Sequence, residues 1–174
     1  MIRETAERSA SASRRIARYI ERTPLRRSTA FSDSLQADIY FKLENRQTTG
    51  SFKLRGAMNR LLTLSDGQKA RGCVAASSGN HGAAVACAMH ELGLSGIIFV
   101  PEQTSPAKVA KIAGYGGEVR YFGTDGLDTE QHAREFAAQH GMCYVSPYND
   151  EQVIAGQGTC GIEIVADLPD VDMA

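Results

Sequence analysis

A lysine near the start of a predicted helix is the first residue of this sequence that could do covalent chemistry. Lys53 lies in the stretch of residues 42–57, where a helical pattern of apolar residues begins at about Ser51. The positive end of the helix dipole disfavours a cation, so a lysine in the first turn is more easily neutralised. A neutral amine is the form that Schiff-base chemistry requires. The same position also suits an ordinary solvated lysine, and the residue alone does not decide between the two.

A glycine-containing turn offers a second candidate site. Residues 76–82 read Ala-Ser-Ser-Gly-Asn-His-Gly and lie between a predicted buried strand and an Ala-rich predicted helix. Gly79 and Gly82 would let the backbone come close to a ligand, and the free amides at a helix start suit a carboxylate or phosphate. Helix capping by Ser and Asn explains the turn equally well, and His81 by itself is as consistent with a structural hydrogen bond as with a base. The side chains that could add donors are Ser77, Ser78 and Asn80.

Two glycines interrupt the last predicted helix. Gly156 and Gly158 stand two residues apart in the stretch Ala155-Gly156-Gln157-Gly158-Thr159. Each glycine destabilises a helix interior by roughly 1 kcal/mol relative to alanine. Such a cost indicates close backbone packing or a nearby ligand, and the spacing does not separate these two explanations.

Short apolar stretches alternate with helical patterns along most of the chain. Ile39, Phe41 and Leu43 alternate with polar positions and predict a half-buried strand. The later apolar runs are continuous, as in strands buried inside a parallel sheet. Strand–helix repetition predicts an α/β fold, a doubly wound parallel sheet that binds ligands at the carboxyl ends of its strands. These strands are expected at 73–76, 96–100, 118–122 and 142–146, and helices from 51, 81–91, 106 to about 114, 127–140 and 151–167.

Composition narrows the class of protein. Nineteen basic and twenty acidic residues give a net charge of −1, so neither a nucleic acid nor an anionic membrane is an expected partner. Arginines and serines near the N-terminus faintly resemble a transit peptide, but Glu4 and Glu7 argue against one, and Ile16 and Ile20 at helical spacing predict a surface helix. We therefore expect a cytoplasmic protein. The cysteines, interpreted as small buried hydrophobes in a reducing compartment, are Cys73, Cys87, Cys143 and Cys160.

The three stretches, in this order and at these separations, resemble the threonine/serine dehydratase group of fold-type II pyridoxal-phosphate enzymes. This group includes serine racemase and the hydroxyectoine-utilisation dehydratases. The similarity runs from about Arg15 to the end of the chain, and the lysine stretch together with Ser-Ser-Gly-Asn-His is its specific signal. The resemblance overrides the interpretation of Lys53 as an ordinary lysine. Further matching segments are Arg22-Thr23-Pro24-Leu25, Val100-Pro101 with Thr104 and Lys108, Gly117-Glu118-Val119, and residues 153–159.

The resemblance implies a role for each candidate residue. Lys53 would bind pyridoxal 5′-phosphate as a Schiff base and later move the proton at the substrate's Cα. Phe52 would support the side of the cofactor ring, and Asn80 would hydrogen-bond its 3′-oxygen. A small amino acid would be the substrate, and no metal is expected. The groups around the substrate carboxylate would be Ser77, Ser78, Gly79, Asn80 and His81.

The resemblance also implies a division of the chain. Residues 1–71 and 148–174 would be incomplete parts of a larger cofactor domain, and residues 72–147 a smaller, complete α/β domain. In relatives, a glycine-rich loop for the cofactor phosphate and a Ser or Cys facing the pyridine nitrogen follow the part that this sequence matches. We therefore expect a truncated fold that binds pyridoxal phosphate poorly, does not turn over by itself and exposes apolar surface. Measurable 2-oxo acid from L-threonine would contradict this expectation. The full enzyme is expected to be a homo-oligomer.

Three activities remain open at this stage. The first is a dehydratase (ammonia-lyase) that converts a β-hydroxy amino acid such as L-threonine or L-serine to a 2-oxo acid and ammonia. The second is racemisation or a related reaction on the same scaffold. Ser78 keeps it open, because members similar to serine racemase place an acid/base serine there, whereas many threonine dehydratases have alanine. The third is a non-catalytic fragment.

Overall fold

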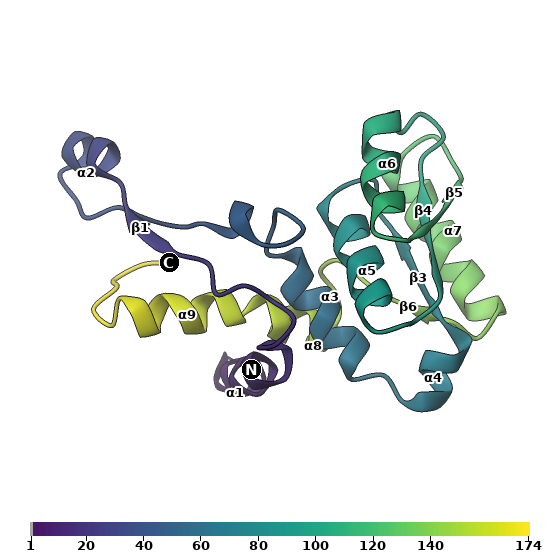
Figure 1. Cartoon of the computed structure of the whole chain (residues 1–174), viewed down its shortest axis with the longest axis horizontal. Helices are drawn as coiled ribbons and strands as arrows, with labels where there is room; N and C mark the ends of the chain where they lie inside the picture. Colours follow the sequence, from purple (N-terminus) through teal and green to yellow (C-terminus); the bar gives the residue numbers. More distant parts are fainter. Residues whose placement is uncertain (1) are drawn as a thin grey trace.

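A four-stranded parallel sheet organises one end of the molecule in the computed structural model, which describes residues 2–174 (Figure 1). The strand order is β5-β4-β3-β6. The two central strands were predicted to the residue, whereas the predicted ends of β5 and β6 run one and two residues too far. The bounds are β3 Cys73–Ala76, β4 Gly96–Val100, β5 Glu118–Tyr121 and β6 Cys143–Tyr144.

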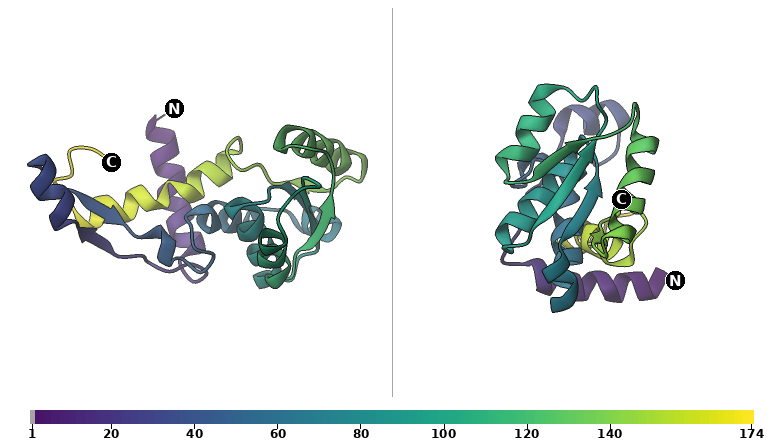
Figure 2. Two further views of the ribbon diagram at one scale, coloured as in Figure 1. Left: turned by 90° about the horizontal axis from the view of Figure 1, so that it is seen from above. Right: turned by 90° about the vertical axis from the view of Figure 1, so that its right-hand side faces the viewer.

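Helices cover both faces of this sheet, as the right-hand view in Figure 2 shows. Helices α5 (Asn80–Glu91) and α6 (Pro106–Gly114) lie on one face, and α7 (Gly126–Gln139) lies on the other. Alternate strand residues point to opposite faces: Ile98 joins the core beneath α5, whereas Val74 and Phe99 join a second core beneath α7. The predicted doubly wound α/β arrangement is confirmed.

Helix α3 (Lys53–Leu62) connects the sheet to the rest of the molecule. It packs against both α5 and α8 (Glu151–Gln157), and the predicted apolar face is confirmed because Leu54, Met58 and Leu61 are buried. A Cβ built on Gly156 of α8 would lie 2.4 Å from the carbonyl oxygen of Arg55. Close helix packing therefore explains this glycine.

The predicted single helix over residues 151–167 is two helices. Helix α8 ends at Gln157, and α9 (Thr159–Asp167) begins after Gly158. A Cβ on Gly158 would lie 2.4 Å from Ser9 Oγ, so this residue allows α1 (Ile2–Ile16) to cross at the break. Figures 1 and 2 show α9 continuing away from the sheet beside α1.

The N-terminal third contains the largest departures from the predicted elements. Helix α1 ends at Ile16, which is buried, so Ile20 lies outside the helix that was expected to contain both. Strand β2 forms where expected. Phe41, however, is 45% exposed and packs edge-on against Phe31 of α2, so the prediction that Phe41 lies on a buried face was wrong. The remaining elements are β1 Leu25–Arg27, which pairs antiparallel with β2 Tyr40–Lys42, α2 Thr29–Leu35, the 3-10 helix η1 Glu44–Arg46 and α4 Asp66–Arg71.

Two kinds of feature are absent from residues 2–174. None of the helices there is long and apolar enough to cross a membrane. Over the same residues, no group of three or more His, Cys, Asp or Glu side chains is placed to hold a metal ion.

Candidate active site

Lys53 is the first residue of α3, and its side chain points toward the carboxyl edge of the sheet. Its Nζ donates a 2.8 Å hydrogen bond to the carbonyl oxygen of Pro147, in the segment that follows β6. Partial burial lowers the pKa of Lys53, and the helix N-terminus acts in the same direction. Phe52 precedes it as the N-cap residue, 40% exposed, with its ring centroid 5.2 Å from Nζ. The amine is thus held beside a ring and partly shielded from water.

His81 lies beside this lysine and is bound to the same segment. Its Nε2 donates to the carbonyl oxygen of Val145 at 2.9 Å, two residues before the carbonyl that accepts from Lys53. Burial, helped by the charge of Lys53 and opposed by the hydrogen bond to Val145, lowers the pKa of His81 to about 4, so the ring is neutral at pH 7. A neutral ring that donates through Nε2 leaves a lone pair on Nδ1. His81 therefore serves the structural hydrogen bond considered for it and still presents an acceptor.

Several buried polar atoms near Lys53 have no hydrogen-bond partner within residues 2–174. They include Thr49 Oγ1, Ser51 Oγ and His81 Nδ1, on side chains that are 1%, 7% and 4% exposed. Buried polar atoms without partners cost about 1–3 kcal/mol each. Two of these residues precede Lys53 by two and four positions, so a polar ligand at Lys53 would have unpaired groups within its surroundings.

The turn after β3 leads into helix α5, whose first amides have no side-chain cap. The N–H of Ser77 donates to the carbonyl of Phe99 at 3.0 Å, and the N–H of Gly79 donates to Ser77 Oγ at 3.1 Å. Gly79 is the N-cap residue of α5, and no side chain caps this helix. Capping by Ser or Asn is therefore not what the turn provides, which leaves the first-turn amides available to an anion. Ser78 is half-buried and Asn80 is exposed as the first helical residue.

Gly82 has a different role from the one expected of it. A Cβ at this position would lie 2.2 Å from the carbonyl oxygen of Ser77 and 3.2 Å from Ile98. The residue allows α5 to fold tightly back onto the strand that it follows. It packs against the protein itself and does not give a ligand access to the backbone.

Side chains from two helices, α3 and α8, donate hydrogen bonds to the carbonyl of Pro147. It also accepts a 3.3 Å hydrogen bond from Nε2 of Gln157, so the third predicted stretch contributes a side chain next to Lys53. The hydroxyl of Tyr148 donates to Glu130 Oε2 at 2.8 Å, which ties the next residue to α7. The contacts to the Pro147 carbonyl were not predicted, because backbone carbonyls carry no signal in the sequence.

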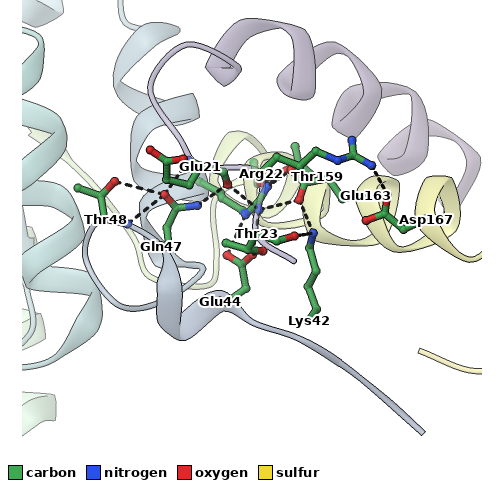
Figure 3. Close-up of polar contacts among 12 residues, drawn as sticks. Glu21, Arg22, Thr23, Lys42, Glu44, Gln47, Thr48, Thr159, Glu163 and Asp167 are labelled. Atoms are coloured by element: carbon green, nitrogen blue, oxygen red, sulfur yellow. Dashed lines mark hydrogen bonds and ion pairs between the residues drawn. The ribbon is translucent and has the colours of Figure 1, made fainter. Parts of the chain in front are cut away.

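A buried ionic cluster supports the helix that carries Lys53. Arg55, two residues later, is 0% exposed and forms paired hydrogen bonds with two carboxylates. Its Nε and Nη2 donate to Glu44 at 2.9 and 2.8 Å, and its Nη1 and Nη2 donate to Glu163 at 2.7 and 3.0 Å. Lys42 adds a second cation, with Nζ 2.5 Å from Glu163 Oε2 (Figure 3). The two positive and the two negative charges of the cluster therefore cancel.

The cluster joins segments that are distant in sequence. Glu44 belongs to η1, Lys42 to β2 and Glu163 to α9, and all contact α3 through Arg55 or one another. Burial alone would raise the pKa of Glu163, but hydrogen bonds from Arg55 and Lys42 outweigh it and lower the pKa. The carboxylate therefore stays ionised, and the cluster holds the first turn of α3 against α9.

Known proteins match almost the whole of this chain. The pattern of the pyridoxal-phosphate dependent enzyme family matches residues 16–174. The catabolic L-threonine dehydratase of Escherichia coli strain K12 is 44% identical over 163 residues, which are 92% of this chain and 49% of that protein. The L-threo-3-hydroxyaspartate ammonia-lyase of Saccharomyces cerevisiae is 42% identical over 161 residues, again 92% of this chain and 49% of the relative. The chain therefore spans about half the length of these relatives.

Solved structures show the same likeness. Maize serine racemase superposes with a TM-score of 0.91 at 34% identity, over 96% of this chain and 51% of that protein. The expected fold, that of fold-type II pyridoxal-phosphate enzymes, is confirmed by this superposition.

Proposed function

The chain belongs to the pyridoxal-phosphate dependent enzyme family, and on this premise we propose that it carries the lysine and substrate-carboxylate groups of an ammonia-lyase for β-hydroxy amino acids. The proposal rests on groups that lie side by side at one edge of the sheet. An amine of lowered pKa, Lys53, lies beside His81, whose helix offers uncapped amides at the same edge of the sheet. Similarity to a threonine dehydratase and to a hydroxyaspartate ammonia-lyase supports this reaction class.

The residues present fit the cofactor. Lys53 would hold it covalently through Nζ, Phe52 would lie beside its ring and Asn80 would bind its 3′-oxygen. The buried, unpaired hydroxyls of Thr49 and Ser51 are polar groups that a cofactor at Lys53 would have near it. When bound, pyridoxal phosphate supplies an electron sink for charge that develops at the substrate's Cα.

The chain's own groups would orient the substrate and move one proton. The amides of Asn80 and His81 at the start of α5 would bind the substrate carboxylate, with Ser77, Ser78 and Gly79 beside them. Fixing the carboxylate sets the direction of the Cα–H bond relative to Lys53, whose Nζ would take the proton from Cα. Loss of the β-hydroxyl would then give a 2-oxo acid and ammonia after reaction with water.

A second activity, racemisation of serine, is favoured by one residue. Ser78 is half-buried in the turn, where its hydroxyl could donate a proton to Cα from the face opposite Lys53. The similarity to maize serine racemase agrees with this alternative. Chiral analysis of L-serine incubated with the full-length enzyme decides it: D-serine that disappears in Ser78→Ala supports racemisation, and its absence from the unmodified enzyme excludes it.

The remaining features of the whole enzyme are part of the same proposal. We propose that residues 72–147 form the smaller domain, that residues 1–71 and 148–174 belong to the larger one, and that the enzyme is a cytoplasmic homo-oligomer. A longer chain of this enzyme, run on a calibrated sizing column, gives the oligomeric state directly. A monomer there would contradict that part.

The carboxylate site can be tested on the chain as it is. In two-dimensional NMR, addition of L-serine should shift the amide signals of residues 78–81 saturably. Ethanolamine, which has the same amine and hydroxyl but no carboxylate, should leave them in place. Shifts of equal size with both compounds, or no shift with L-serine at high millimolar concentration, would contradict the assignment of this turn.

A further inference from the structure

Two cysteines lie opposite each other on neighbouring strands, outside the proposed active site. Cys73 begins β3, Cys143 begins β6, and the parallel register pairs them directly. Neighbouring strands are about 4.8 Å apart, which is within the Cα separation that a disulfide spans. Both side chains enter the same core, and their proximity raises the pKa of Cys73 and lowers that of Cys143.

A positive charge stands next to one of the two sulfurs. Arg60 of α3 places Nη2 3.3 Å from Cys143 Sγ, and its Nε lies 2.8 Å from Asp150 Oδ2. The side chains of Arg60 and Asp150 are each 19% exposed, and Cys143 is 8% exposed whereas Cys73 is fully buried. The neighbouring Cys73 thiol and the charge of Arg60 together lower the pKa of Cys143, although burial opposes them.

Burial dominates at Cys87 and Cys160, and at Cys160 the nearby charges of Arg55 and Lys42 do not offset it. Burial raises the pKa of Cys87, and it raises the pKa of Cys160 to about 11. A thiolate is the nucleophilic form of cysteine, so reactivity toward an oxidant should concentrate at Cys143.

We propose that Cys73 and Cys143 are a redox-sensitive thiol pair that a hydroperoxide oxidises to a disulfide, with Cys143 reacting first. The Cys143 thiolate attacks one peroxide oxygen and the O–O bond breaks, which gives Cys143 sulfenic acid and a hydroxide that becomes water on protonation. The Cys73 sulfur then attacks the Cys143 sulfur, forms the S–S bond and displaces a second hydroxide. In sum, two thiols lose two electrons and two protons, and hydrogen peroxide becomes two water molecules. The inference does not depend on the proposed function.

The first test is the position of the bond. The folded chain is treated with hydrogen peroxide, alkylated, digested without reductant and analysed by mass spectrometry. A cross-linked peptide pair that contains Cys73 and Cys143 is expected before any change at Cys87 or Cys160. In Cys73→Ser, a sulfenic-acid trap such as dimedone should mark Cys143. Faster oxidation of Cys87 or Cys160, or absence of the cross-link, would overturn the proposal.

The second test varies the charge and leaves both cysteines in place. Arg60→Gln should slow the cross-linking roughly fivefold at pH 7, because a smaller fraction of Cys143 is then thiolate. Asp150→Asn should speed it up roughly twofold, because it removes the negative charge that raises this pKa. Asparagine can still cap α8, as Asp150 does by accepting from the amides of Gln152 and Val153.

Two variants are used so that the second test gives an answer even if one of them does not fold. Circular dichroism and a urea midpoint show whether each variant is folded. Unchanged rates in both folded variants would overturn the role of the charge. If Arg60→Gln does not fold, an unchanged rate in Asp150→Asn alone would do so.

Discussion

Substitution of Arg55 by methionine removes the central cation of the buried cluster and keeps an unbranched, apolar side chain in place of the arginine stem. In the native chain the charges of Lys42, Arg55, Glu44 and Glu163 sum to zero, and Arg55 has no exposed surface. The variant keeps one cation and two carboxylates, so one buried negative charge is left without compensation. Removal of one partner from a buried ion pair costs about 3–5 kcal/mol. For a chain of this size that loss corresponds to a melting temperature lower by roughly 10 °C.

Urea unfolding followed by circular dichroism measures this loss. Arg14→Met, at an exposed helical position, serves as the matched control and should change the free energy of unfolding by less than about 0.5 kcal/mol. Glu163→Met should be destabilising as well, because it leaves one excess positive charge. The double variant of Arg55 and Glu163 keeps Lys42 and Glu44, which balance, so it should cost at least about 1 kcal/mol less than the sum of the single variants. A loss below about 1 kcal/mol for Arg55→Met, or strict additivity in the cycle, would refute the reasoning.

Two further predictions concern packing and pH. Gly156→Ala should destabilise the chain by about 2 kcal/mol or more, because its Cβ would meet the Arg55 carbonyl at 2.4 Å. Gly161→Ala in α9, where a Cβ would have no atom within 4 Å, should be neutral or slightly stabilising. Urea unfolding midpoints compare the two variants, and equal changes in stability would contradict the packing account. The lowered pKa of His81, about 4 when folded, gives a contribution to stability that is present above its ordinary value of about 6.5 and is lost as pH falls from there toward 4. An NMR titration of its ring protons should show a midpoint near 4, and a midpoint above 6 would contradict the burial of this side chain.

The sequence allowed the sheet and its covering helices to be predicted, because apolar runs and helical spacing are local signals. Strands β3 and β4 and helix α3 were placed to within two residues. The division at Gly158 was not predicted, because it follows from contact with Ser9, far away in the sequence.

The candidate site was predictable only in part. Residue type made Lys53 and the turn with His81 candidates, and only the family resemblance favoured a functional role for them. Their partners are the backbone carbonyls of Pro147 and Val145, a group that every residue has. Arg55 gave no signal, because a charged residue is ordinarily exposed and the carboxylates that justify its burial are 11 and 108 residues away.

Selective labelling of Lys53 tests the central claim most directly. The folded chain is incubated with pyridoxal 5′-phosphate near pH 7.5, reduced with borohydride and mapped by peptide mass spectrometry. Reduction makes each adduct permanent, so the pattern can be read even where affinity is low. Because its pKa is lowered, Lys53 should be labelled well ahead of the exposed Lys108 and Lys111, and Lys53→Arg should abolish the fast phase. Labelling of Lys108 or Lys111 as fast as Lys53 would contradict the assignment of Lys53 as the cofactor-binding amine.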